Sequence, residues 1–294
     1  MQEVAAPTSE GFVAMALRVL VSGILEFDSG KTWSVIALAR SLLERGVRVA
    51  LFKPVAGHNI WGSARTLRMS AELGMLVGND VSAYMRYLGG IDPGVSNPVA
   101  LALAYPDPLA FHGVSQYLSA TVDTASMLVL ARVHDCRAQR TQHYVFPVNV
   151  SRLTRAMRRE VERLAERLGA APAHPGETLE SLSGPGAESV LEGCRERLEE
   201  DAEVLIVESF NNAVAPYNRI VDVVDFFVVV APGRLMLYSG DRLRAAYELL
   251  GSVSRVDRIL PVLSKPIATL ELPIAESPIE LAEHVGPIVD VIAP

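Results

Sequence analysis

The chain alternates short, uniformly apolar runs with longer segments in which apolar residues recur at helical spacing. The apolar runs are rich in β-branched residues, are bounded by glycine, proline or charged residues, and lie at 18–21, 47–52, 204–207, 226–231 and 259–263. Such runs are typical of strands whose two faces are both covered. We therefore predict a strand of a parallel sheet at each of these positions.

Segments with helical periodicity lie between the predicted strands. In 32–44 the apolar residues recur at intervals of three and four, which places them on one face of a helix. Similar patterns predict helices over 151–168, 187–200 and 235–250. Strands that alternate with helices need crossover connections. The predicted fold is therefore α/β, with a mostly parallel, doubly wound sheet.

Two further segments follow other patterns. Residues 125–150 contain two strand-like runs joined by a polar turn, which predicts a hairpin added to the parallel core. Residues 169–186 are rich in Gly, Pro and Ser, which predicts a surface loop. We expect a single domain over 1–294, with 105–150 as an inserted element.

Composition and charge narrow the class of protein. The chain has 294 residues, 50% of them hydrophobic, and a net charge of −7, so it provides no general positive field that would attract nucleic acid or an anionic membrane. No run approaches the roughly 18 apolar residues that cross a bilayer. Cys136 and Cys194 form no CxxC or Cys/His cluster, which indicates neither a disulfide framework nor a zinc site. We predict a cytoplasmic protein without a nucleic-acid or membrane partner.

Lysine is used three times among 27 basic residues, and two of the three lysines follow the first two predicted strands. Lys31 lies in SGILEFDSGKT, between the first strand and a helix, and Lys53 follows the second strand. A phosphate-binding loop needs backbone N–H groups at a helix N-terminus, a glycine, a lysine for the β and γ phosphates and a hydroxyl for Mg²⁺. The stretch supplies all of these, although Leu25 stands where the usual Walker A spacing has glycine.

The loop therefore predicts a nucleotide site in which the phosphates lie over the start of the helix. The candidate nucleotide-binding residues in this stretch are Gly23, Glu26, Phe27, Asp28, Ser29, Gly30, Lys31, Thr32 and Trp33. Glu208 ends the third predicted strand, at the same edge of the sheet. A carboxylate in that position is costly to bury unless it is paired or bound to metal.

These segments resemble the dethiobiotin synthetase family. GILEFDSGKT…ALARSLLERGVRVALFKPVAGH is similar to that family's GTDTxxGKT, LaraL and KPv motifs. SNPVALALAYPDP at 96–108 and VLIVESFNNAVAPYN at 204–218 are similar to its NPyal and vvVEGAGGl.vP segments. The resemblance covers most of the chain. It implies a P-loop NTPase fold, ATP and Mg²⁺ as cofactors, a small-molecule acceptor and a homodimer.

The resemblance also implies roles for individual residues. Lys31 would bind the β and γ phosphates, and Thr32 would ligate Mg²⁺. Lys53 would neutralise the substrate's carbamate or the transferred phosphoryl group, and Glu208 would coordinate Mg²⁺ or orient its water. The implied catalytic residues are thus Lys31, Lys53 and Glu208, and the implied metal ligands are Thr32 and Glu208.

The chain departs from the family's pattern at the acceptor side. Ser209, Asn211 and Asn212 stand where the family's VEGAGG segment has glycines, which indicates a different acceptor or a different pose. The hydroxyl of the family's KPVxTG motif is missing. For the family's Mg²⁺-binding aspartate, Glu72 is the nearest candidate, although a solvated helix face is the preferred explanation of this residue. His58 is expected in a loop that faces the phosphates, as a core or lid residue rather than a catalytic one.

Trp61 is expected in the same loop as a lid or core residue. Lys265 follows the last predicted strand, so Ser264, Lys265 and Pro266 are candidates for the pocket of the nucleotide base. An exposed lysine at a strand end is an equally good interpretation of Lys265. No pattern in the sequence separates ATP from GTP.

The predicted function is Mg²⁺-dependent ATP hydrolysis or transfer of the γ-phosphoryl group to a small molecule. DSGKT is also similar to the loop of polynucleotide 5′-hydroxyl kinases, which would need a basic channel or stacking aromatic residues. Only the arginines of the predicted hairpin, Arg132, Arg137 and Arg140, offer such a feature. A third alternative is a nucleotide-gated regulatory protein with weak turnover, which a missing second Mg²⁺ carboxylate would allow.

Overall fold

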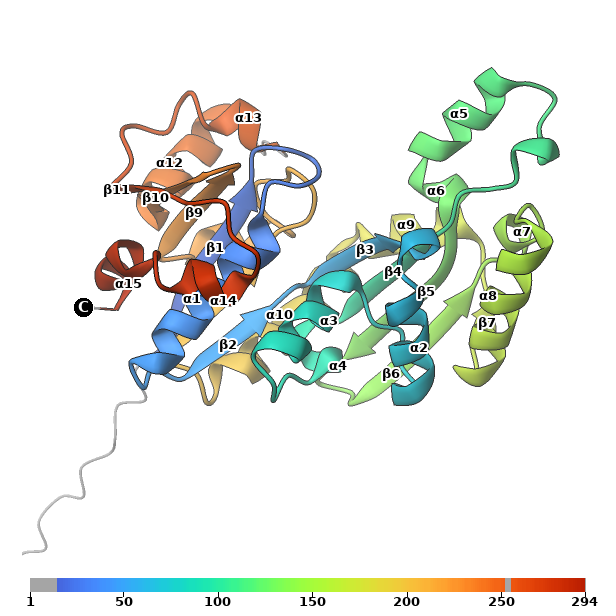
Figure 1. The fold of residues 1–294 in the computed structure, drawn as a ribbon, viewed down its shortest axis with the longest axis horizontal. Helices are drawn as coiled ribbons and strands as arrows, with labels where there is room; N and C mark the ends of the chain where they lie inside the picture. The colour runs from blue at the N-terminus through green and yellow to red at the C-terminus, as the bar shows by residue number, and fades with distance from the viewer. Residues whose placement is uncertain (1–14, 252–254, 294) are drawn as a thin grey trace, which may run out of the picture.

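The computed structural model describes residues 15–251 and 255–293, which form an α/β protein with two β-sheets (Figure 1). Sheet A has six strands in the order β11-β10-β9-β1-β8-β2, and sheet B has five in the order β3-β4-β5-β6-β7. The strands of sheet A are β1 (Leu17–Gly23), β2 (Val49–Phe52), β8 (Val204–Glu208), β9 (Phe226–Ala231), β10 (Arg234–Ser239) and β11 (Ala268–Glu271). Those of sheet B are β3 (Val55–Asn59), β4 (Val99–Leu103), β5 (Leu128–Asp135), β6 (Arg140–Val145) and β7 (Ala171–Pro172).

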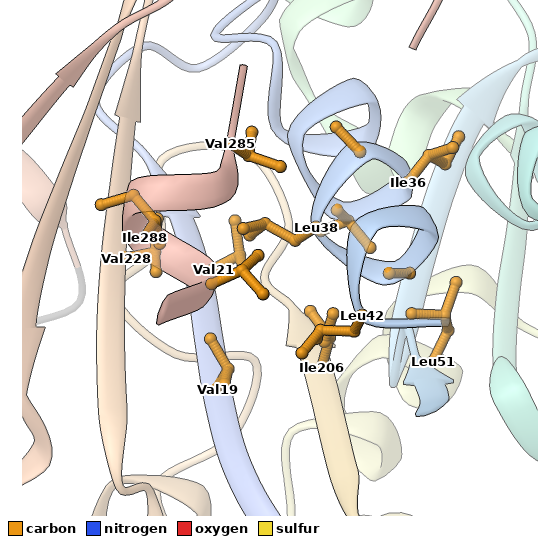
Figure 2. Packing of buried hydrophobic residues seen from close by; sticks show 14 of the residues in the cluster. Val19, Val21, Ile36, Leu38, Leu42, Leu51, Ile206, Val228, Val285 and Ile288 are labelled. Atoms are coloured by element: carbon orange, nitrogen blue, oxygen red, sulfur yellow. The ribbon is translucent and has the colours of Figure 1, made fainter. Parts of the chain in front are cut away.

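Four strands of sheet A, β9, β1, β8 and β2, run parallel. They are apolar throughout because both faces are covered: Val19 and Val21 of β1 belong to one core cluster and Leu20 to the other. Figure 2 shows the first cluster, in which side chains of β1, β8 and β9 pack beneath Leu38 and Leu42 of α1 (Lys31–Glu44). Each such buried side chain contributes about 1.5–3 kcal/mol.

Helices cover the two faces of sheet A separately. The first face is covered by α1, α3 (Asn79–Tyr87), α14 (Pro278–Ala282) and α15 (Gly286–Ile292). The second face is covered by α10 (Pro185–Glu199), α11 (Arg219–Val223), α12 (Gly240–Leu250) and α13 (Val256–Ile259). The doubly wound, largely parallel sheet predicted from the sequence is therefore present as sheet A.

Sheet B has its own helices and a third core cluster. The helices that contribute to this cluster are α2 (Ala64–Leu73), α7 (Pro147–Val150) and α8 (Arg155–Arg167), and the 3-10 turn η1 (Ile60–Gly62) precedes α2. Helices α3 and α10 of sheet A also contact sheet B, at β3 and β5. The shorter elements are α4 (Pro93–Ser96), η2 (Pro108–Ala110), α5 (Val114–Val122), α6 (Thr124–Met127) and α9 (Pro175–Leu182). Helices α5 and α6 project from one end of sheet B (Figure 1).

The predicted hairpin within 125–150 exists as β5 and β6, which are antiparallel. It was expected to extend the parallel core, and this was wrong: β5 pairs with β4, in sheet B. The segment 169–186 is not only a loop, because it contains β7 and α9, a helix that begins at Pro175. Proline suits the first turn of a helix, where its missing N–H is not needed.

The C-terminal third differs most from the prediction. The predicted helix 235–250 is strand β10 followed by α12, and the change occurs at Ser239, whose side chain caps the helix by accepting from the N–H of Arg242. Gly240 is required there, because a Cβ atom would lie 1.8 Å from the carbonyl oxygen of Val224. The predicted strand 259–263 is the end of α13 and a turn.

A disulfide joins Cys136 to Cys194, whereas the sequence indicated no disulfide framework. It connects the turn between β5 and β6 to α10, so residues 58 positions apart are brought together by tertiary contacts that cysteine spacing does not reveal. No helix among residues 15–251 and 255–293 is long and apolar enough to cross a bilayer. The cytoplasmic location stays a prediction.

The two sheets meet at Lys53 and Pro54, which link β2 directly to β3. The N–H of Lys53 donates to the carbonyl of Ser96 at 2.7 Å, and the N–H of Val99 donates to the carbonyl of Pro54 at 3.1 Å. The buried amide of Asn97 donates to the carbonyl of Lys53 at 2.8 Å. The backbone of Lys53 is thus held by the segment that leads into β4.

Candidate functional site

The loop between β1 and α1 is folded back on itself. The hydroxyl of Ser29 accepts from the N–H of Leu25 at 2.9 Å and donates to the carbonyl of Leu25 at 2.8 Å. A Cβ atom at Gly23 would lie 2.6 Å from Ser29 Oγ and 2.9 Å from Lys31 Nζ, so only glycine fits there. Gly30 precedes the helix at φ +88°, a left-handed conformation that glycine adopts without strain.

A cavity of about 550 Å³ opens over this loop and the N-terminus of α1. It brings together most of the residues that the sequence suggested, and its lining consists of Glu26, Phe27, Asp28, Ser29, Gly30, Lys31, Thr32, Trp33, Lys53, Gly57, Asn79, Asp80, Ala83, Glu208, Phe210 and Asn211. Gly23 lies just beneath, against the side chain of Lys31. The size is within the range of small-molecule sites.

Lys53 lies between two carboxylates on the floor of this cavity. Its Nζ atom is 2.8 Å from Glu208 Oε1 and 2.9 Å from Asp80 Oδ2, and it also donates to the carbonyl of Ser209 at 2.8 Å. Burial opposes the charge, but the two carboxylates raise the pKa of Lys53 above its ordinary value. Lys53 is therefore a buried ammonium whose three donors all have partners.

Thr32 lies against the same two carboxylates. Its Oγ1 atom is 2.9 Å from Glu208 Oε1 and 3.0 Å from Asp80 Oδ1. A hydroxyl carries one proton, so it can donate to only one of these oxygens at a time. One hydroxyl and two carboxylates are the hard oxygen ligands that Mg²⁺ takes together with phosphates and water. These three residues therefore fit a magnesium ion that arrives with a nucleotide.

The described residues hold no group of three or more His, Cys, Asp or Glu side chains that could bind a metal by themselves. In nucleotide sites, Mg²⁺ is bound through one or two carboxylates and the substrate's phosphates. The metal ligands predicted from the sequence, Thr32 and Glu208, lie together, and Asp80 joins them.

Glu208 is fixed by a buried tyrosine. Tyr84 of α3 is fully buried, and its hydroxyl donates to Glu208 Oε2. Burial raises the pKa of Glu208, and burial together with the nearby carboxylate raises the pKa of Tyr84 well above its ordinary value. Asp80 is different: although burial acts against its charge, the ammonium of Lys53 lowers its pKa. Asp80 is thus the more acidic of the two carboxylates.

Lys31 is directed across the cavity toward the loop after β8. Its Nζ atom donates to the backbone carbonyl of Asn211 at 2.6 Å. Burial and the neighbouring ammonium of Lys53 lower the pKa of Lys31. A carbonyl is a weaker partner for an ammonium than a phosphate oxygen, which carries charge. Lys31 is therefore positioned to exchange this carbonyl for an anionic ligand.

Asp80 was missed in the sequence, where Glu72 was the nearest candidate for a second carboxylate. Glu72 is exposed on α2 and does not line the cavity, which agrees with its interpretation as part of a solvated helix face. Asp80 lies in the first turn of α3, two residues after Gly78. The signal was the pattern Gly-Asn-Asp before a helix, because acidic residues favour helix N-termini.

Lys265 does not line this cavity. It lies before β11, whose first residue, Ala268, pairs with Leu237 of antiparallel β10, close to the amino-terminal edge of the parallel strands. The loop that contains Lys31 follows Gly23, at the carboxyl-terminal edge. Lys265 is exposed and its carbonyl accepts from Arg242 at the start of α12. The prediction of a base pocket at Ser264, Lys265 and Pro266 therefore has no support in the topology.

His58 and Trp61 do not lie in a loop over the phosphates. His58 is a buried residue of β3, and its Nε2 atom lies 3.2 Å from Thr66 Oγ1. The hydroxyl of Thr66 donates to the carbonyl of Ser63, so His58 donates from Nε2. Burial lowers the pKa of His58 to about 4. Trp61 is exposed in η1 and is not part of the cavity lining.

Comparisons with protein-family models, with characterised proteins and with solved structures give no match. The resemblance to dethiobiotin synthetases therefore stays a hypothesis. What the chain's own geometry provides is a cavity at a helix N-terminus with two ammonium groups, two carboxylates and a hydroxyl on its floor.

Proposed function

We propose that this protein binds Mg-ATP in the 550 Å³ cavity and either hydrolyses it or transfers its γ-phosphoryl group to a small-molecule acceptor. The observation that carries this proposal is the meeting of Lys31, Thr32, Lys53, Asp80 and Glu208 in one cavity at the start of α1. A helix N-terminus, a glycine-rich approach and a lysine are the features that bind phosphates in P-loop proteins.

The residues suggest a division of labour. Lys31 would leave the Asn211 carbonyl and bind the β and γ phosphates. Lys53 would neutralise charge that develops on the transferred group by exchanging one of its present partners, Asp80 or Glu208, for that group. Thr32, Asp80 and Glu208 would hold Mg²⁺, which supplies charge neutralisation at the phosphate oxygens. Tyr84 keeps Glu208 in place.

Catalysis in this proposal comes from positioning and charge rather than from a covalent nucleophile. The two exposed aromatic side chains in the lining, Phe27 and Trp33, are suited to contact a nucleotide base. Dethiobiotin synthesis is the specific form of the proposal that the resemblance suggests. A homodimer stays a prediction on the same ground.

The two alternatives have less support. The regulatory alternative rested on a missing second carboxylate, and Asp80 supplies one. The polynucleotide kinase alternative rested on three arginines, of which Arg132 is fully buried and Arg137 is paired with Glu196 at 2.7 Å. Only Arg140 of the three is exposed without an ion pair among the described residues.

The test is phosphate release from Mg-ATP, measured with and without diaminopelargonate plus bicarbonate. We expect Lys31→Ala to lower turnover by a factor of about 100 or more, because it removes the charge at the β and γ phosphates. Lys265→Ala is the matched control, since it removes an exposed lysine at the opposite edge of the sheet, and its turnover should equal that of the wild type.

Each outcome decides between forms of the proposal. Stimulation by diaminopelargonate that is lost in Lys31→Ala would identify a dethiobiotin synthetase. Lysine-dependent release without stimulation would identify an ATPase or kinase with another acceptor. Equal rates for wild type and Lys31→Ala would rule out catalysis through this loop.

A further inference from the structure

A second cavity, of about 380 Å³, lies directly beside the nucleotide cavity. The two cavities share two lining residues, Phe210 and Asn211, which belong to the loop after β8. The second cavity extends from this loop to α9, α10 and α12. A molecule bound in it would therefore be separated from the nucleotide phosphates by the Phe210–Asn211 wall.

The charged residues that line the second cavity are already compensated. Glu188 accepts from the N–H of Asn218 at 3.0 Å with one oxygen and lies 3.6 Å from Arg219 with the other. Arg255 is paired with Asp257 at 2.8 Å. Glu188 and Arg255 are one acidic and one basic side chain, so the lining carries no net formal charge. The lining thus favours a ligand without a net charge.

The remaining polar groups of the lining are amides and hydroxyls. The hydroxyl of Tyr247 donates to Asn218 Oδ1 at 2.8 Å, and that of Tyr217 donates to Glu192 Oε1 at 2.6 Å. Tyr247 and Asn218 both line the cavity, and the phenol oxygen of Tyr247 can still accept a hydrogen bond. Tyr217 instead bonds Glu192, which is not part of the lining. The side chain of Asn212 adds an amide. An oriented acceptor beside amides is suited to ligand hydroxyl groups.

The wall between the cavities is tied to the nucleotide site. Lys31 Nζ donates to the Asn211 carbonyl at 2.6 Å, and Asn211 has a left-handed backbone with φ +45°. The same short loop is closed by Ser209, whose hydroxyl donates to the carbonyl of Ala213 at 2.9 Å. In the proposed function Lys31 exchanges the Asn211 carbonyl for a phosphate oxygen, so the loop loses its bond to Lys31. The left-handed backbone of Asn211 costs energy because Asn211 is not glycine, and without the bond to Lys31 fewer contacts hold it in that conformation.

We propose that the second cavity is the acceptor site, that its ligand is a neutral small molecule rich in hydroxyl groups, and that nucleotide binding at Lys31 releases the Phe210–Asn211 wall between acceptor and γ-phosphate. This inference rests on the proposed function. It differs from the resemblance, which implies a charged diamine.

Ligand-observed NMR tests the class of ligand. The probes are glycerol, D-ribose and myo-inositol, compared with putrescine and succinate, each with Mg²⁺ and a non-hydrolysable ATP analogue. We expect saturation transfer to at least one hydroxyl-rich probe, reduced threefold or more in both Asn212→Ala and Tyr247→Phe. Gln116→Ala, an exposed change on distant α5, should leave it unchanged. Thermal unfolding shows whether each variant is folded.

Hydrogen exchange tests the coupling. The N–H of Ala213 donates to the carbonyl of Phe210 at 3.0 Å, so its exchange should become faster when the ATP analogue binds, while amides of the phosphate loop become slower. Trp33 lines the nucleotide cavity, so its fluorescence reports nucleotide binding independently.

The outcomes separate this inference from the proposed function. If the analogue protects the phosphate loop but Ala213 exchange is unchanged or slower, the coupling is wrong and the nucleotide site stands. If no hydroxyl-rich probe binds, or if putrescine or succinate binds and loses its signal in Asn212→Ala, the ligand class is wrong. If the analogue gives neither a Trp33 response nor protection, the proposed function fails, and the coupling fails with it.

Discussion

Sheet A and sheet B are stabilised in different ways. The central strands of sheet A carry Val, Leu, Ile and Phe on both faces. The buried charged side chains of sheet A lie near strand ends: Arg18 in β1, and the cavity carboxylate Glu208 at the carboxyl end of β8. Sheet B and its connections bury a further set of polar side chains, among them Asn97, Arg132, His143 and Asn149. Buried polar groups are stable only while their partners are in place.

The difference assigns separate tasks to the two sheets. Sheet A provides the loop between β1 and α1 together with Glu208, and both stand on the apolar core clusters that cover its two faces. Sheet B provides the seam that holds Lys53, through Ser96 and Asn97, and the chain between β3 and β4 supplies Asp80. We therefore expect substitutions in sheet B and its connections to displace Lys53 or Asp80 before the loop between β1 and α1 is disturbed.

The largest effect is expected where the two sheets meet. Lys53→Met leaves Asp80 and Glu208 buried or half-buried without their cation, which should cost about 3–5 kcal/mol of unfolding free energy. It should also abolish turnover. The measurement is urea unfolding together with phosphate release.

A second substitution distinguishes a charge effect from a packing effect. Lys53→Met combined with Glu208→Gln should recover part of the lost stability, because one buried charge is removed, but no activity. Lys265→Met is the control for loss of a lysine and should change neither property. Full stability in the single variant Lys53→Met would contradict the ion cluster described here.

The disulfide provides the next test. It ties the β5–β6 turn of sheet B to α10, which packs against strands of both sheets. For a separation of 58 residues, the chain-entropy account gives about 4 kcal/mol of stability. Cys136→Ser with Cys194→Ala should therefore lower the urea midpoint, and reductant should lower that of the wild type equally. An unchanged midpoint in reductant would show that sheet B does not need the bond.

The sequence was most informative for sheet A. Continuous β-branched runs identify β1, β2, β8 and β9, because only strands covered on both faces are apolar throughout. The sequence placed a loop between a strand and a helix at 23–32, and the structure has this loop between β1 and α1; its binding of phosphate stays a prediction. Lys53 and Glu208 could be placed because the carboxyl ends of parallel strands share one edge.

Other features could not be predicted, for identifiable reasons. The run LMLY in 235–238 fits a helix or a strand equally, and the antiparallel pairing of β10 with β9 decides between them. This pairing also places Lys265 near the amino-terminal edge of the parallel strands, opposite the edge at which the cavity lies. Asp80 reaches the cavity only because α3 folds beside the loop that contains Thr32. The Cys136–Cys194 bond forms only because α10 lies beside the β5–β6 turn. Each depends on tertiary contacts rather than on local pattern.

Acid should weaken sheet B through His58. Its pKa is lowered to about 4 in the folded protein by burial, against about 6.5 in an unfolded chain. Between these values the unfolded state binds more protons, so stability falls as the pH falls through this window, by about 3 kcal/mol in total. Urea unfolding at pH 7.5, 5.5 and 4.5 measures this.

The control separates His58 from the general effect of acid on carboxylates. His58→Gln should show a shallower loss of stability between pH 6.5 and 4 than the wild type. His112→Gln, at an exposed histidine, should follow the wild type. If His58→Gln and wild type lose stability in parallel, burial of this histidine does not make sheet B acid-sensitive.

The smallest effect on stability, and the sharpest on function, is expected at Asn97. Its amide donates to the carbonyls of Lys53 and Val99 at 2.8 and 2.7 Å, and Asn149 makes an equivalent pair to Ala125 and Leu128 away from the cavity. Asn97→Ala and Asn149→Ala should each cost about 2 kcal/mol, since each leaves buried carbonyls without donors.

Only one of these two variants should change the chemistry. Asn97→Ala frees the backbone of Lys53, so kcat should fall tenfold or more (about 10–100-fold for a misplacement near 1 Å) while nucleotide affinity changes little. Asn149→Ala should keep the wild-type kcat at a temperature where both variants are folded. An equal loss of kcat in both would mean that sheet B acts on the site only through overall stability. A loss of kcat confined to Asn97→Ala would mean that the side chain of Asn97 positions Lys53.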